Sequence, residues 1–146
     1  MNEAGPFVVV AAFCEKVLRE LDGAVSAIRI FDSIELQSEG SDPQALPVVS
    51  LRFLLVIRCG TKFGDLKVQL VLASPSGTRA PAHRIQSSVD TPGAGMIWNV
   101  EVTTSVKETG LYWMEVSADG AGLLTRVPLR VTTKQTPPSG TGPSNS

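Results

Sequence analysis

The dominant pattern along the chain is the alternation of apolar and polar side chains, and no long stretch repeats with the period of a helix. Segment 48–59, VVSLRFLLVIRC, shows it most clearly. Its odd-numbered positions are all apolar, whereas its even-numbered positions mix apolar residues with Arg52 and Arg58. Because successive side chains of a strand point to opposite faces, we expect the odd set in the core and the even set outside.

Later segments repeat this alternation and are expected to be strands: 65–74, 95–104, 111–117, 126–131 and, more weakly, 82–88. With segment 48–59 they give this expected inward set: Val49, Leu51, Phe53, Leu55, Ile57, Cys59, Leu66, Val68, Leu70, Leu72, Met96, Trp98, Val100, Val102, Tyr112, Met114, Val116, Val127, Leu129 and Val131. Pro128 then points outward and cannot donate to a ladder, which predicts an edge strand for the last segment.

The first third of the chain is ambiguous between two structures. Segment 14–21 could form a short helix, because its charged residues fall four positions apart. The β-rich residues before it and the Asp-Gly turn at 22–23 favour instead a hairpin of strands near 6–20 and 24–36. Asp32 is the one acid on an otherwise apolar strand face, and a bulge that turns it outward is a better account than a buried acid.

The segment ETGLYWM, residues 108–114, distinguishes a sandwich from a barrel. It resembles the motif of acid, small residue, tyrosine and cysteine that opens the penultimate strand of immunoglobulin-type domains. The resemblance implies that the hydroxyl of Tyr112 bonds back to upstream backbone and that Met114 replaces the disulfide cysteine. Together with short strands and no intervening helices, it predicts an all-β, immunoglobulin-like antiparallel β-sandwich of about seven or eight strands.

A fainter resemblance covers most of the chain. The stretches FCEKVLRELDGAVSAIRIFDSI, PVVSLRFLLVIRC and TGLYWMEVSADGAGLLTRVPLRV are similar to those of a family of uncharacterised bacterial single-domain proteins. Those proteins open with a Gly-containing hairpin and close with a G-x-Y strand, a hairpin and a V-P-L-x-V-like strand. The resemblance implies a bacterial, cytoplasmic β-sandwich and carries no activity, so no functional residue is transferred from it.

Composition sets the domain organisation and limits the partners. The 146 residues suit one domain over 1–133, followed by a Pro-, Gly- and Ser-rich tail over 134–146 that we expect to be disordered. The net charge of −1, with 13 Lys and Arg spread along the chain, disfavours nucleic acid. The N-terminus has no pattern of a signal peptide or membrane span, which favours the cytoplasm. Cys14 and Cys59 are therefore expected as buried thiols, with a disulfide or redox pair as the alternative.

No catalytic constellation stands out, so we expect a protein that is not an enzyme and has no cofactor and no metal. His83 is the only histidine, and a hydrolase would need it beside a serine or an acid. SPSG at 74–77 lacks the flanking glycines of a nucleophile elbow and is expected to be a turn. Five acids lie beside turn residues and would bind calcium only if several gathered at one end of the sandwich: Asp22, Asp42, Asp65, Asp90 and Asp119.

The sharper site prediction is a patch on the outer face of one sheet. It assumes that the strand at 48–59 and the strand at 111–117 are neighbours, which would join apolar residues with a charged rim. The predicted interface residues are Arg52, Leu54, Val56, Arg58, Leu111, Trp113 and Glu115. The patch would contact a protein partner or a second copy, unless residues 37–47 or 78–90 cover it. The alternative function is a small-ligand or carbohydrate-binding sandwich that stacks its ligand on Trp98 or Trp113, and a hydrolase comes third.

Overall fold

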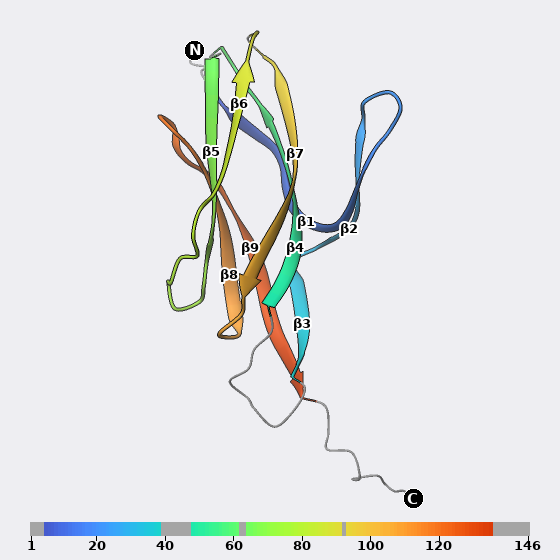
Figure 1. Ribbon diagram of the computed structural model, residues 1–146, viewed down its shortest axis with the longest axis vertical. Coiled ribbons are helices and arrows are strands. Elements are labelled where there is room, and N and C mark those ends of the chain that lie inside the picture. The colour runs from blue at the N-terminus through green and yellow to red at the C-terminus, as the bar shows by residue number, and fades with distance from the viewer. Residues whose placement is uncertain (1–4, 39–47, 62–63, 92, 136–146) are drawn as a thin grey trace, which may run out of the picture.

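The protein is built from β-strands arranged in two layers (Figure 1). The computed structural model describes residues 5–38, 48–61, 64–91 and 93–135, and contains no helix among them. The strands are β1 (Phe7–Arg19), β2 (Val25–Phe31), β3 (Ser33–Ser38), β4 (Val48–Arg58), β5 (Gly64–Ala73), β6 (His83–Val89), β7 (Gly95–Ser105), β8 (Gly110–Ala118) and β9 (Gly122–Gln135). The all-β sandwich is thus confirmed, with slightly more strands than the sequence predicts.

Strand order makes the sandwich immunoglobulin-like. The first sheet has the order β2-β1-β4-β7 and the second has the order β3-β9-β8-β5-β6. All pairs are antiparallel except β3 with β9. Immunoglobulin domains place strands A, B and E in one sheet and C, F and G in the other. Here β1, β4 and β7 take the first three places, and β5, β8 and β9 take the other three.

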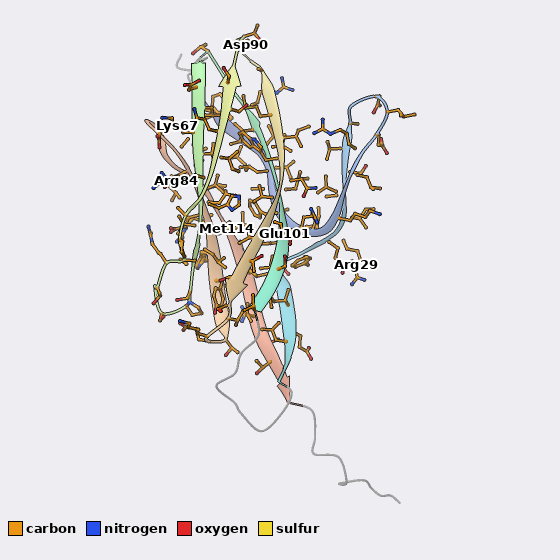
Figure 2. The ribbon with its side chains drawn as sticks, in the orientation of Figure 1. Arg29, Lys67, Arg84, Asp90, Glu101 and Met114 are labelled. Carbon is orange, nitrogen blue, oxygen red and sulfur yellow. The ribbon has the colours of Figure 1, made fainter. Side chains whose placement is uncertain are left out.

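The core lies between the two sheets and contains the residues that the alternation predicts. None of the twenty residues expected to point inward is exposed, and Met114 lies between the sheets (Figure 2). Phe13 of β1 packs edge-on against Phe53 of β4, with ring centroids 5.0 Å apart, and both side chains are fully buried. Burial of each large apolar side chain contributes about 1.5–3 kcal/mol, so these positions dominate stability.

The N-terminal hairpin is confirmed, and the helix considered for segment 14–21 is wrong. The Asp-Gly turn closes it, because Gly23 has a φ of 89° and the backbone N–H of Glu20 donates to the carbonyl of Ala24 at 2.8 Å. The second predicted strand is in fact two, since β2 pairs with β1 in the first sheet and β3 pairs with β9 in the second. Asp32 lies at this transfer with its side chain exposed, and its carbonyl accepts the N–H of Arg130 at 2.8 Å.

The prediction that Pro128 marks an edge strand is wrong, because β9 lies between β8 and β3. The proline is tolerated for a local reason. Pairing with β3 begins only at Arg130, whose N–H points to the β3 side. Backbone groups two residues apart point the same way, so the nitrogen of Pro128 also faces the β3 side, ahead of the first β3 pair. Pro128 therefore costs no hydrogen bond of the β8–β9 ladder.

The remaining predictions concern loops and the tail. The weak strand expected near 82–88 is β6. The predicted loop at 37–47 and the predicted tail from 134 both start within strands, because β3 runs to Ser38 and β9 to Gln135, and these two residues pair. The rest of both segments, 39–47 and 136–146, lies outside the described residues.

Candidate interaction surfaces

The predicted outer-face patch does not exist as one surface. Arg52, Leu54, Val56 and Arg58 lie on β4 in the first sheet, whereas Leu111, Trp113 and Glu115 lie on β8 in the second. The error comes from counting the two strands of the N-terminal hairpin as the first and second major strands, A and B, which makes the strand at 48–59 the third, C, and a neighbour of the penultimate strand. β1 and β2 are in the same sheet as β4, so β4 itself occupies the B position and β5, not β4, neighbours β8.

Trp113 points outward, as predicted, but neighbouring side chains of the second sheet, including Arg126 and Pro128, lie against it. It pairs with Ala73 on one side and with Pro128 on the other. The guanidinium carbon of Arg126 lies 4.5 Å from the centre of its ring, within range of a cation–π contact. These neighbours leave Trp113 only partly exposed.

Glu115, on the same face as Trp113, forms an ion pair. Its Oε1 lies 2.9 Å from Nη2 of Arg79, which belongs to the 78–90 segment, and its side chain is only 15% exposed. We define the braced face as Leu111, Trp113 and Glu115 with Arg79 and Arg126. The alternative considered for the patch was a cover formed by segment 78–90. Arg79 of this segment does cover Glu115, whereas Trp113 is covered by Arg126 of β9.

The arginines of β4 are also held along their sheet. Arg52 donates from Nη1 to Oδ1 of Asn99 at 2.9 Å, and Arg58 donates from Nη1 to the carbonyl of Gly93 at 3.1 Å. Leu54 is 4% exposed although it points outward. The β4 part of the predicted patch is therefore partly covered by side chains of its own sheet.

Exposed apolar side chains gather instead at the N-terminal strands. Eight large apolar side chains of the described residues are exposed, and six of them lie in the first thirty residues. They are Phe7, Val9, Leu18, Leu21, Ile28 and Ile30. Val9 points away because the β1–β4 register shifts between Val8 and Val10. Sequence reasoning missed this concentration.

Four of the six lie on a two-stranded ribbon, which we call the arm (residues 15–30). The β1–β4 pairing ends at Cys14, and beyond it β1 pairs only with β2. The ribbon leaves the sandwich and turns away from it, and Arg29 points outward from it (Figures 1 and 2). The sequence does carry a signal for this: Glu15 and Lys16 are adjacent, so both faces of the strand bear a charge and neither suits a core.

The arm has two different faces. Leu18, Ile28 and Ile30 fall on one face, because Ile28 pairs with Lys16 and Ile30 pairs with Cys14. On the opposite face, Nε of Arg29 lies 3.5 Å from Oε1 of Glu15. Arg29 has a φ of 55°, which is uncommon for a residue with a side chain.

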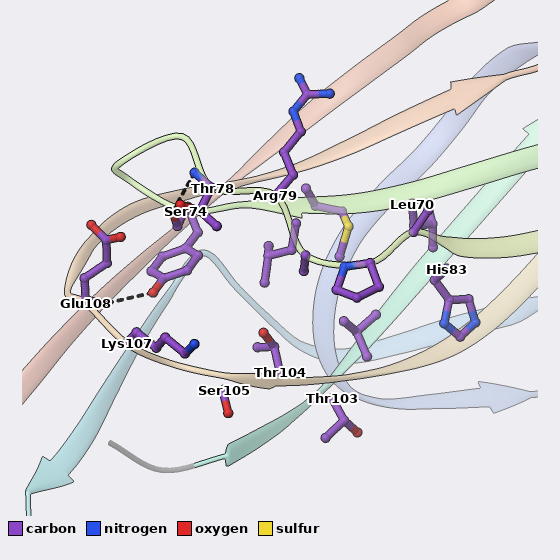
Figure 3. A pocket seen from close by; sticks show the side chains of 17 residues that line it. Leu70, Ser74, Thr78, Arg79, His83, Thr103, Thr104, Ser105, Lys107 and Glu108 are labelled. Carbon is purple, nitrogen blue, oxygen red and sulfur yellow. Dashed lines mark hydrogen bonds between the residues drawn. The ribbon is translucent and has the colours of Figure 1, made fainter. Parts of the chain in front are cut away.

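A cleft of about 580 Å³ opens between the sheets, beside β7 (Figure 3). Leu70, Leu72 and Met114 line it from the second sheet, and Val102 to Ser105 line it from β7. At one end the hydroxyl of Tyr112 donates to the carbonyl of Glu108 at 2.7 Å, which is the tyrosine corner that the resemblance implied. Burial raises the pKa of Tyr112.

His83 is at the rim of this cleft and is exposed. None of the side-chain hydrogen bonds between described residues involves it, so the pair that a hydrolase requires is not formed there. No group of three or more His, Cys, Asp or Glu side chains in the described ranges could hold a metal ion. Asp42 lies outside those ranges.

The two cysteines are free and buried, as expected. Burial raises the pKa of both thiols, and for Cys14 the nearby charge of Arg52 opposes part of that effect. Trp98 packs against the core and Arg126 lies over the ring of Trp113. Trp98 is thus only partly exposed and turned toward the core, and at Trp113 an arginine already lies over the ring on which a carbohydrate ligand would stack.

Comparisons with known proteins add little to this geometry. No protein-family model matches the chain, and no curated protein matches it. A β-glucosidase from Listeria innocua, solved with glucose, is similar over 70% of this chain at 14% identity and a TM-score of 0.45, and the chain spans 15% of its length. An immunoglobulin-like protein from Pseudomonas aeruginosa is similar over 90% of this chain and 99% of its own, at 14% identity and a TM-score of 0.42. Likenesses this weak carry no functional argument. Among the described residues, no helix is long and apolar enough to cross a membrane.

Proposed function

We propose that this β-sandwich is a non-enzymatic interaction module of the cytoplasm that contacts another protein through its arm. The observation that carries the proposal is the concentration of exposed apolar side chains there, from Leu18 at 38% to Leu21 at 110% exposure. Apolar surface that gathers in one place usually marks a contact site. The buried free thiols support a reducing compartment.

The arm is shaped for contact on one face only. Its apolar face carries Leu18, Ile28 and Ile30 with one charge, Lys16, and its other face carries the ion pair between Glu15 and Arg29. A two-stranded ribbon without a layer against it is marginally stable in water. A partner that covers the apolar face would therefore bury surface and order the ribbon at the same time.

The simplest partner is a second copy of this chain. β2 is the edge strand of the first sheet, so two arms related by a two-fold axis could meet through the same residues on each side. Such an isologous contact would place Ile28 and Ile30 of one copy against the arm of the other. The surface is then self-complementary, and association depends on protein concentration.

The test is sedimentation velocity on the variant Leu21→Ser/Ile30→Ser, with Leu123→Ser as the matched control. Leu123 is 58% exposed, close to the 62% of Ile30, but lies at the β8–β9 turn. We expect the wild type and the control to associate and the arm variant to stay monomeric. Its unfolding curve should match that of the wild type at concentrations where the wild type is also monomeric. A wild type that is monomeric throughout, or a control as defective as the arm variant, would overturn the proposal.

A further inference from the structure

The outer edge of β7 has no strand partner among the described residues. β7 pairs only with β4, and its neighbour in an immunoglobulin sheet would be strand D. Natural edge strands usually carry lysine, proline or a bulge that blocks further pairing. The sequence of β7, GMIWNVEVTTS, has no lysine or proline and one charged residue, Glu101. Its pairing with β4 also runs without a register shift from Val48 to Arg58.

The direction of the backbone groups of β7 follows from one hydrogen bond. The N–H of Cys59 donates to the carbonyl of Ala94 at 2.8 Å, in register with the β4–β7 ladder. Antiparallel ladders alternate, so even-numbered residues of β7 bond to β4 and odd-numbered residues point their N–H and C=O to the open edge. Asn99, Glu101 and Thr103 therefore offer a row of donors and acceptors with the spacing that an added extended strand matches.

The cleft defines the side chains of the occupant. It lies beside the second half of β7, with Thr103, Thr104 and Ser105 along one side and the 74–83 segment along the other (Figure 3). A strand added next to β7 would point alternate side chains into this space. Leu70 and Leu72 are 2% and 4% exposed and form its floor. An apolar side chain of moderate size suits that lining.

The charges at the rim favour a carboxylate at one end. Nη2 of Arg79 is 2.9 Å from Glu115, and the carboxylate of Glu108 accepts a hydrogen bond from Ser76 at 2.6 Å. Lys107 lies at the same end of the cleft, is exposed, and forms no ion pair with any described side chain. Of the described cations at this end, Lys107 is thus the one without an ionic partner, although the carboxylate of Glu108 lies beside it, and it is the group that an acid of the ligand would pair with.

A second copy fits this edge less well than a separate peptide. If two β7 strands paired across a two-fold axis, the side chains turned toward the core would be Trp98, Val100 and Val102 of the other copy. Val100 is 7% exposed, and all three already pack within their own sandwich. They could not also fill the cleft, so the cleft requires a strand with side chains that are not yet buried.

We propose that the open edge of β7 and the adjoining cleft bind an extended peptide segment with apolar side chains at alternate positions and a carboxylate at the end that meets Lys107. The segment joins the first sheet as an added strand. This site is separate from the arm, so it extends the proposed function and does not depend on it.

The probes are two labelled peptides in which valine alternates with threonine. One has a glutamate at its N-terminal end and the other has a glutamate at its C-terminal end. A peptide of the same composition with its valines contiguous is the control ligand. Binding is read by fluorescence anisotropy and by the exchange of individual backbone amides. We expect the alternating peptide to bind and to slow exchange at Asn99, Glu101 and Thr103, with no effect at β6.

Two proline variants test the edge itself. Thr103→Pro removes one N–H that faces the open edge and leaves the β4–β7 ladder intact, so it should weaken binding by about tenfold. The same change on the edge of the other sheet, Gln86→Pro, should alter the affinity by no more than about twofold. Equal losses in both variants would contradict a site at β7.

A charge swap covers the case in which a proline variant fails to fold. Lys107→Glu changes an exposed side chain and should weaken the binding of the glutamate peptide. A peptide with lysine in place of glutamate should bind this variant and so restore the affinity. Ile30→Ser on the arm should leave peptide affinity unchanged. The absence of binding by both alternating peptides, or equal binding of the contiguous control, would overturn the inference.

Discussion

The braced face of the second sheet and the arm of the first both carry outward-pointing apolar residues, yet they are held in opposite ways. Trp113 lies between Ala73 and Pro128 with Arg126 over its ring. Ile30 has no such cover and is 62% exposed. An outward aromatic residue on a central strand can be part of the structure, whereas the exposed residues of a projecting ribbon are available for contact.

This contrast implies a division between stability and association. Side chains of the braced face are expected to contribute to the free energy of unfolding and not to binding. Side chains of the arm are expected to do the reverse, because exposed positions contribute little to folding. Each prediction below would break the contrast if stability and association changed together.

The largest effect on stability is expected from Trp113→Ser. The change removes a partly buried ring and its cation–π contact, and we expect it to lower the free energy of unfolding by about 2 kcal/mol. Chemical denaturation measures this. The association state of the folded protein should equal that of the wild type, and a monomeric, fully stable variant would show that Trp113 is the interface after all.

A smaller loss is expected from Tyr112→Phe, which keeps the ring and removes the hydrogen bond to the carbonyl of Glu108. The cost should be about 1 kcal/mol. Burial raises the pKa of Tyr112 above its usual value of about 10, so folding favours the neutral phenol. Its contribution is therefore complete below pH of about 10 and is lost as the pH rises through the raised pKa of the folded state.

Denaturation at neutral and alkaline pH checks the linkage. The wild type should lose stability more steeply than Tyr112→Phe above pH of about 10. Parallel curves for the two proteins would contradict a buried, hydrogen-bonded phenol in the native state.

The smallest effect is expected from Arg126→Gln. The guanidinium is exposed where it lies over Trp113, so its removal should cost no more than about 1 kcal/mol. Tryptophan fluorescence offers a second measurement, since the Trp113 ring becomes more solvated. Trp98→Phe, a change in the core cluster, keeps Trp113 as the only emitting tryptophan and makes the reading specific.

Sequence alone predicts the sandwich because burial imposes a period of two on every strand that faces a core. The alternation around Phe53 and Met114 thus identified the inner faces, and the residues around Tyr112 identified the corner. Which strands are neighbours in a sheet is not visible in the alternation of apolar and polar residues. Nothing in the pattern of β4 says whether β8 lies in the same sheet, and the predicted patch failed on that point.

Two further features depend on tertiary structure rather than on local pattern. The chain transfers between sheets at Asp32, and the apolar positions on both sides of it read as one strand. The cleft beside β7 exists because no described strand pairs with its outer edge, which no residue within β7 specifies. The arm, in contrast, could have been predicted from the adjacent charges at Glu15 and Lys16.

Amide hydrogen exchange at increasing protein concentration tests most directly whether the arm is the contact surface. Backbone amides between Lys16 and Ile28 pair only within the hairpin, so in a monomer they should exchange readily. We expect their exchange to slow as the concentration rises, while exchange in β8 around Trp113 stays constant. Protection that rises around Trp113 and not in the arm would contradict this expectation.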